Sequence, residues 1–254
     1  MIATSSEAVR PLRKPITSNG VDLHTTTFIG TNWMVRGPDA PPPPRPGELY
    51  PMAFLVEQPP GAVVAAHFHQ ADQFQVVVAG GGTLGRHPVA PVTVHYTNAH
   101  TAYGPIAAGK EGLHYFTLRN GYDPGARYLP QATPELKAVT GRHPWQTTTE
   151  AVARADFTPS RVEELLAPRE DGLGAWRHFL PPGGSATGPD PASGRGQFWM
   201  VVAGEVAGPR GEGSEGALPP LSLIFVAPNE APLTLQAGPA GAEVLAMQYP
   251  IRAH

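Results

Sequence analysis

Two segments of this chain are near copies of one another. Residues 73–80 read QFQVVVAG and residues 197–204 read QFWMVVAG, so six of the eight positions are identical at an offset of 124. Matches in one order and at nearly constant spacing indicate a duplication, so we expect two similar domains in tandem. Three further pairs of segments match in the same order: 59–61 with 181–183, 92–96 with 221–225, and 112–118 with 241–247.

The composition favours a β protein with many turns. The 254 residues include 31 prolines and 29 glycines, and only 15% of the residues are charged. Proline and glycine are unfavourable inside helices and common in turns. A hydrophobic fraction of 41% is enough to fill a core. We therefore expect an all-β fold with short helices only in the connection between the two repeats.

The repeat and the breaks between its copies predict the domain boundaries. Thr133 before Pro134 predicts one short helix in the linker, and Ser160 with Glu163 has the spacing of a capping box and predicts a second. The expected parts are an N-terminal arm with a proline-rich segment (1–47), a first domain (48–122), a linker (123–171) and a second domain (172–250).

Charge, cysteine content and hydropathy exclude several classes of protein. The net charge is −3, without the basic stripe that nucleic-acid binding requires. The chain has no cysteine, which excludes disulfides and thiolate metal sites. No apolar window reaches the length of a membrane span, and the N-terminus lacks the apolar stretch of a signal peptide. We expect a soluble cytoplasmic protein.

The first copy carries a pair of histidines ahead of its repeated strand. Residues 61–80 read GAVVAAHFHQADQFQVVVAG. His67 and His69 are separated by one residue, so on a β-strand their side chains point to the same face. Imidazole nitrogens suit transition metals such as iron, nickel and zinc. The pair is therefore a candidate for binding one divalent metal.

This segment resembles the first motif of the cupin family, G-x5-H-x-H-x3-E-x6-G, with Gln73 where the family has glutamate. With the duplication, the chain resembles a bicupin, which implies two antiparallel double-stranded β-helix (jelly-roll) barrels of the RmlC-like type. The resemblance also implies one divalent transition metal per chain (Fe, Mn, Ni or Zn). Its ligands would be His67, His69, the residue at position 73 and one further histidine.

The second cupin motif supplies that further histidine, and residues 96–105 contain no clean match to it. Residue type favours His100 as the ligand. The register of the two copies favours Tyr103, which falls opposite Pro232 of the second copy. Three possibilities stay open: a shell of His67, His69 and His100 with Gln73, a two-histidine site with Tyr103 and waters, or no metal. Tyr103 and Gln73 are also the candidates for handling a proton beside a metal.

The second copy lacks the histidines. At the offset of 124, Pro191 and Ser193 replace His67 and His69, and Trp199 replaces Gln75. An inward indole would fill the space of a metal and substrate. We therefore predict one metal-binding cupin and one degenerate cupin.

Other polar residues of the first copy are harder to place. Six of the ten histidines lie within residues 67–114. His95 and His114 can face either side of their strands. Arg119 ends a strand, and we expect it to be exposed.

The resemblance implies a metal-dependent enzyme with oxygenase-type chemistry on a small aromatic or enolisable carbonyl substrate. The missing glutamate and the irregular second motif favour an alternative, a non-catalytic protein that binds a small molecule or a metal. The fold alone cannot decide between them. We further expect a bacterial homodimer that acts on a small molecule and has no nucleic-acid or membrane partner.

Overall fold

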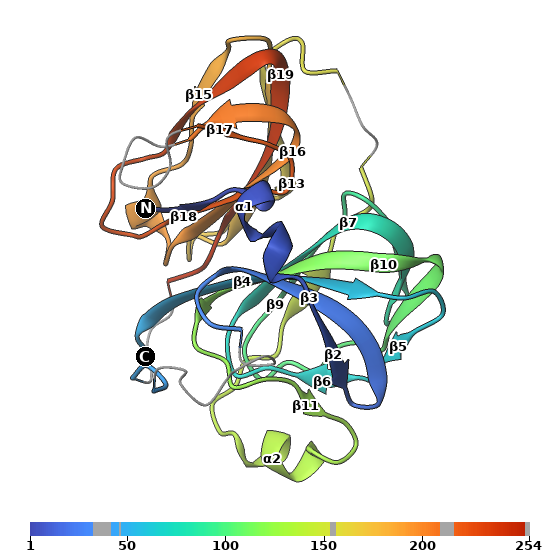
Figure 1. Ribbon diagram of the computed structural model, residues 1–254. Coiled ribbons are helices and arrows are strands. Elements are labelled where there is room, and N and C mark those ends of the chain that lie inside the picture. Colours follow the sequence, from blue (N-terminus) through green and yellow to red (C-terminus); the bar gives the residue numbers. More distant parts are fainter. Residues whose placement is uncertain (33–41, 46, 153–155, 209–215, 252–254) are drawn as a thin grey trace. The chain divides into compact units, whose positions relative to one another are not determined.

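The structure is a computed structural model that describes residues 1–32, 42–45, 47–152, 156–208 and 216–251 (Figure 1). The chain divides into two compact units. We call residues 12–153 the N-terminal unit, and residues 1–11 together with 154–254 the C-terminal unit. Each unit is built on one large antiparallel sheet, so the all-β prediction is confirmed at this level.

The sheet of the N-terminal unit has nine strands in the order β12-β9-β7-β10-β4-β3-β2, with β5 beside β10 and β8 beside β7. A separate pair, β6 (His67–Phe68) and β11 (Arg127–Tyr128), carries the first histidine. The one α-helix described in this unit is α2 (Thr133–Ala138). The nine strands are β2 (Lys14–Ser18), β3 (Val21–Ile29), β4 (Leu49–Gln58), β5 (Val63–Val64), β7 (Gln73–Leu84), β8 (His87–Val89), β9 (Val94–Thr97), β10 (Ile106–Gly121) and β12 (Gln146–Thr148).

The sheet of the C-terminal unit has eight strands in the order β1-β18-β16-β19-β14-β13, with β15 beside β19 and β17 beside β16. Short helical turns are α1 (Ser6–Val9), η1 (Arg10–Leu12) at the boundary of the units, and η3 (Pro191–Ser193). The strands are β1 (Ile2–Thr4), β13 (Arg161–Leu166), β14 (Gly174–Leu180), β15 (Ser185–Thr187), β16 (Gln197–Ala207), β17 (Ala217–Leu218), β18 (Leu223–Val226) and β19 (Thr234–Gln248).

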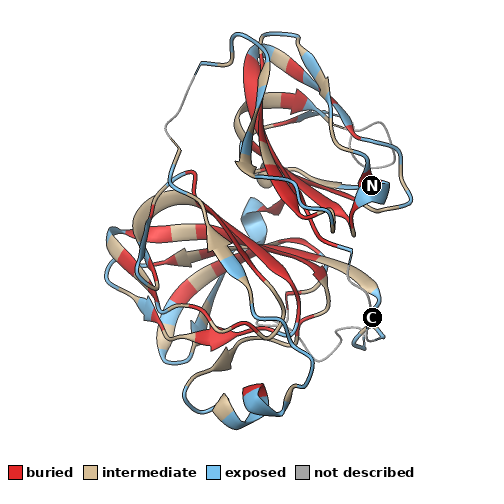
Figure 2. Cartoon of the chain, turned by 180° about the vertical axis from the view of Figure 1, so that it is seen from behind, coloured by how far each residue is buried: buried red, intermediate tan, exposed pale blue. Residues whose placement is uncertain are grey.

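The duplicated strands occupy the centre of each sheet. Strand β7 pairs with β10 in the N-terminal unit, and β16 pairs with β19 in the C-terminal unit. Gly80 and Gly204 have φ of +67° and +70°, and a Cβ at either position would collide with the backbone of the paired strand. Only glycine fits there, which explains why both copies keep it. Figure 2 shows buried residues concentrated along these central strands.

The residue that follows the repeated glutamine-phenylalanine pair has a different environment in each unit. Trp199 of β16 is 2% exposed and belongs to the apolar core of the C-terminal unit. Its indole N–H donates to Gln197 Oε1 at 3.0 Å. The same position in β7 holds Gln75, which lines a cavity.

Two expectations about the flanking segments need correction. Residues 1–47 are not a single arm, because β1 pairs with β18 and because β2 and β3 extend the nine-stranded sheet. The helix expected at Ser160 is wrong, since Arg161–Leu166 forms β13 against β14. Pairing with a neighbouring strand overrides the capping signal there. The helix predicted at Thr133 is present as α2. Much of the proline-rich segment lies outside the described residues.

No helix in the described ranges is both long and apolar enough to cross a membrane.

Replacing Trp199 with alanine should destabilise the C-terminal unit by about 3–5 kcal/mol, because it leaves a cavity in a packed core. The measurement is chemical denaturation followed by circular dichroism. Val162→Ala, at a side chain that is 54% exposed on β13, is the control and should change little. A loss below about 1 kcal/mol for Trp199→Ala would contradict the assignment of this indole to the core.

Candidate functional site

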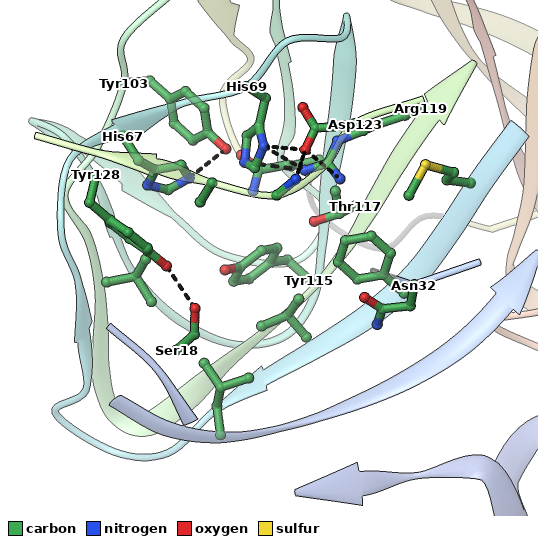
Figure 3. A pocket seen from close by; sticks show the side chains of 18 residues that line it. Ser18, Asn32, His67, His69, Tyr103, Tyr115, Thr117, Arg119, Asp123 and Tyr128 are labelled. Carbon is green, nitrogen blue, oxygen red and sulfur yellow. Dashed lines mark hydrogen bonds and ion pairs between the residues drawn. The ribbon is translucent and has the colours of Figure 1, made fainter. Parts of the chain in front are cut away.

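One side of the nine-stranded sheet lines a cavity of about 140 Å³ in the N-terminal unit (Figure 3). Part of its wall is apolar and part is polar. The apolar side chains come mainly from β3, β4 and the segment before β6. The polar groups gather where β6, β7 and the end of β10 meet. The apolar wall includes Leu23, Met52, Phe54, Val56 and Val64, and the polar wall includes His67, His69, Gln75, Tyr103, Tyr115, Thr117, Arg119, Asp123 and Tyr128.

An isolated β-bridge brings Tyr103 against the first histidine. The backbone N–H groups of His67 and Tyr103 each donate to the other residue's carbonyl at 3.0 Å. Gln73 begins β7, and its opposite residue on β10 is Arg119. Asp123 lies two residues after the end of β10. Four chain segments thus converge on the polar wall.

The hydrogen bonds of His67 fix its tautomer. Its Nδ1 lies 2.7 Å from the carbonyl oxygen of Ala65, which can only accept, so Nδ1 carries the proton. Nε2 therefore presents a lone pair and accepts from the Tyr103 hydroxyl at 2.9 Å. That hydroxyl in turn accepts from Nε2 of Gln73 at 2.7 Å. The phenol of Tyr103 is thereby held as a donor toward His67.

Asp123 fixes His69 in the same tautomer. Nδ1 of His69 donates to Asp123 Oδ1 at 2.9 Å, which leaves Nε2 with a lone pair. The carboxylate also accepts from the backbone N–H groups of Gln70 at 2.7 Å and Gly125 at 2.8 Å. Burial would raise the pKa of Asp123, but Arg119, His69 and the Gln70 amide together lower it below its usual value. Asp123 is therefore ionised at neutral pH.

Arg119 is buried in the site, at 3% exposure, so the expectation that it is exposed is wrong. Its Nε and Nη2 donate to Gln73 Oε1 at 3.0 and 2.6 Å. Nη2 also lies 3.1 Å from both Nδ1 and Nε2 of His69, so it is placed over that ring, and Nη1 is 3.5 Å from Asp123 Oδ1. The alternation of β10 explains this position, because Tyr115 and residues 117 and 119 share one face of the strand.

Burial keeps the remaining groups neutral. It is the largest influence on His67 and lowers its pKa from 6.5 to about 3. Burial also lowers the pKa of His69, with the nearby charge of Arg119 as the next cause. It raises the pKa of Tyr103 above its usual value. At neutral pH the charges of this cluster are therefore the cation of Arg119 and the anion of Asp123.

The described residues bring together most of the predicted site. His67, His69, Gln73 and Tyr103 lie in one hydrogen-bonded cluster. His100 does not line the cavity, and its ring packs 6.2 Å from that of Phe68. Its backbone N–H donates to the carbonyl oxygen of His69 instead.

Sequence reasoning did not predict that two members of the cluster, Arg119 and Asp123, belong to the site. The two-residue alternation along β10 was the available signal for Arg119. Asp123 stands before Pro124 and Gly125, and this tripeptide looks like an ordinary turn.

The arrangement of these groups does not fit a divalent metal. Two lone pairs, on Nε2 of His67 and of His69, face the site, and a carboxylate behind His69 is common around metals. However, the guanidinium of Arg119 donates to Gln73 Oε1 and lies 3.1 Å from His69 Nε2, the atoms that a metal would need. A divalent ion there would meet a buried positive charge. Within the described ranges, no group of three His, Cys, Asp or Glu side chains is placed to hold a metal.

No family model matches the sequence, and no curated protein matches it. Solved structures do match the fold. A putative dioxygenase from Nostoc punctiforme is 13% identical with a TM-score of 0.63, covering 100% of this chain and 84% of its own. A bacterial pirin from Escherichia coli in complex with nickel(II) is 11% identical with a TM-score of 0.58, covering 99% of each chain. An oxalate decarboxylase from Lactobacillus farciminis in a formate complex is 12% identical with a TM-score of 0.60, covering 100% of this chain and 87% of its own.

These neighbours are cupin-fold proteins, so the similarity to cupins predicted from the sequence is supported at the level of fold. One of these structures contains nickel(II) and another contains formate. At such low identity, the comparison assigns no residue of this chain a role.

Acid should destabilise the N-terminal unit through His67. The folded pKa is about 3 and the unfolded value is 6.5, so between these values the unfolded chain binds more protons. Stability is therefore complete above pH 6.5 and is lost as the pH falls toward 3. His67→Gln should reduce the slope of unfolding free energy against pH by up to about 1.4 kcal/mol per pH unit.

Urea denaturation at a series of pH values measures this slope. His87→Gln, at an exposed position on β8, is the control. An unchanged slope in His67→Gln would show that His67 is already protonated in the folded protein.

Proposed function

We propose that the N-terminal unit is a cupin barrel that binds a small planar molecule carrying an oxyanion, without a metal. The ligand would be an aromatic carboxylate or the enolate form of a carbonyl compound. The observation that carries this proposal is the buried guanidinium of Arg119 at the polar wall of a cavity whose other walls are mainly apolar, with Ser18 and Asn32 as the exceptions. A cavity of about 140 Å³ suits a molecule the size of a substituted benzene.

Electrostatics favours an anionic oxygen at this wall. Oδ1 of Asp123 lies 3.5 Å from Nη1 of Arg119, which is longer than a good hydrogen bond. The same carboxylate already accepts hydrogen bonds from His69 and from two backbone amides. The charge of Arg119 is therefore only partly compensated by its own partner. A ligand oxyanion would complete that compensation in a buried setting, where charge-assisted hydrogen bonds are strong.

Protonation states favour binding over acid–base chemistry. General acid–base catalysts work best with a pKa near the operating pH. Burial lowers the pKa of His67 to about 3 and raises that of Tyr103. Neither group exchanges protons readily near neutrality. Both Tyr103 and Gln73 were expected from the sequence to be catalytic. Tyr103 is thus proposed to orient the ligand through a hydrogen bond, and Gln73 to hold Tyr103 and Arg119 in place.

The second candidate is the metal-dependent enzyme with oxygenase-type chemistry expected from the cupin resemblance. It is favoured by the lone pairs that His67 and His69 direct into one cluster. In that case Arg119 would have to leave the bonds it makes to Gln73 and His69. Elemental analysis of protein purified without a histidine tag separates the candidates. Iron, manganese, nickel or zinc near one per chain would support the enzyme.

Arg119→Met should weaken the binding of benzoate, a planar oxyanion, at least about tenfold, because it removes the charge-assisted bond. Isothermal titration calorimetry measures the change. Arg13→Met is the matched control, since Arg13 is about half exposed and pairs with Glu57 away from the cavity. Equal affinity for wild type and Arg119→Met, or a wild type that binds no benzoate, would contradict the proposal.

Gln73→Glu alone should not create a metal site, because the new carboxylate would pair with Arg119 beside it. Combined with Arg119→Met, the same change leaves two histidines and a carboxylate, a set suited to a divalent transition metal. Competitive chelator titration with nickel(II) should show at least about tenfold tighter retention in the double variant than in Gln73→Glu. Arg119→Met alone is the control. Similar retention in Gln73→Glu and the double variant would mean that Arg119 does not exclude a metal.

A further inference from the structure

A small second space of about 10 Å³ lies behind the wall of the main cavity in the N-terminal unit. Gln75 and Tyr115 line both spaces, so these two side chains form the boundary between them. The rest of the second space is largely apolar, apart from Thr93 and His95 of the neighbouring segment. Its volume matches about one non-hydrogen atom.

Two of the residues that line this space each carry a buried polar atom without a hydrogen-bond partner among the described residues. The atoms are Oε1 of Gln75 and Nε2 of His95. The residues are 4% and 2% exposed, and they lie directly opposite each other on β7 and β9. Leaving such a group unsatisfied is energetically costly, so its presence calls for an explanation.

Both atoms are acceptors. We assign the ring proton of His95 to Nδ1, which lies 2.9 Å from the hydroxyl of Thr148, because Nε2 has no partner to which it could donate. Nε2 is left with a lone pair. The amide oxygen of Gln75 cannot donate to it. The pair can be satisfied only by a group that brings its own hydrogens.

The C-terminal unit provides an internal comparison. Its strands β16 and β18 place Trp199 opposite Ile224, where β7 and β9 place Gln75 opposite His95. Both acceptors are thus replaced by hydrophobic side chains in the copy whose core is filled. The duplicated fold does not need the polar pair for its stability.

We propose that Gln75 and His95 form a specificity site that accepts hydrogen bonds from an amino group of the ligand. This inference rests on the proposed function, because the oxyanion of the same ligand would bind at Arg119. Residues 73 and 75 of β7 are two positions apart. The oxyanion site, where Arg119 lies opposite Gln73, and the acceptor site at Gln75 are therefore separated by about 6.8 Å along the strand. A benzene ring with para substituents spans a similar length. The ligand class is therefore a para-amino aromatic acid.

Three probes test the site by calorimetry: benzoate, 4-methylbenzoate and 4-aminobenzoate. The methyl compound has the size of the amino compound without its hydrogens. Wild type should bind 4-aminobenzoate about tenfold more tightly than 4-methylbenzoate. Gln75→Met and His95→Leu should each reduce this ratio to near one. Gln146→Met, an exposed glutamine on β12, should keep it.

Thermal unfolding without ligand gives an independent readout. Gln75→Met should unfold at the same or a higher temperature than wild type, because it removes an unsatisfied buried acceptor. A clear decrease would show that a trapped water already satisfies Gln75, and this would overturn the inference. So would equal binding of the amino and methyl probes by wild type, with the proposed oxyanion site intact. If none of the three probes binds, the proposed function and this inference fall together.

Discussion

The pairing register of β7 with β10 is the constraint on which the site depends. It sets Gln73 opposite Arg119 and Gln75 opposite Thr117, so that alternate residues of both strands face the cavity. A shift of one residue would put Arg119 and the two glutamines on opposite faces of the sheet. Gly80 and Gly112 fix the register at the far end, since neither tolerates a side chain against the neighbouring backbone.

Burial of one arginine then organises the chemistry of the cluster. Arg119 is compensated by Asp123, which orients His69, and by Gln73, which supports Tyr103 and through it His67. Low exposure keeps both imidazoles and the phenol neutral. The result is a site with one cation, one anion and fixed hydrogen-bond directions, which suits the recognition of an oxyanion better than proton exchange.

The two copies share one strand framework, but one has a polar cavity in its interior and the other has a packed apolar core. The position opposite the repeated glutamine on the long strand is Arg119 in one unit and Gln248 in the other. Gln197 and Gln248 bond each other through their amides, without a charge. Trp199 fills the space beside them. The C-terminal unit has thereby exchanged a polar cavity for a packed core.

The duplication, the all-β class, and the nearness of His67, His69 and Gln73 could be predicted from the sequence, because these follow from local spacing and the two-residue period of a strand. Register between the copies also identified Tyr103, which lies beside His67. The sequence did not show that Arg119 and Asp123 lie beside His69, because they are 50 and 54 positions away from it along the chain. Nor could it tell that His95 faces inward and His100 away from the cavity. The positions of these four side chains depend on strand pairing and loop packing. Burial and a neighbouring charge are properties of the folded surroundings, so they could be read only from the tertiary structure.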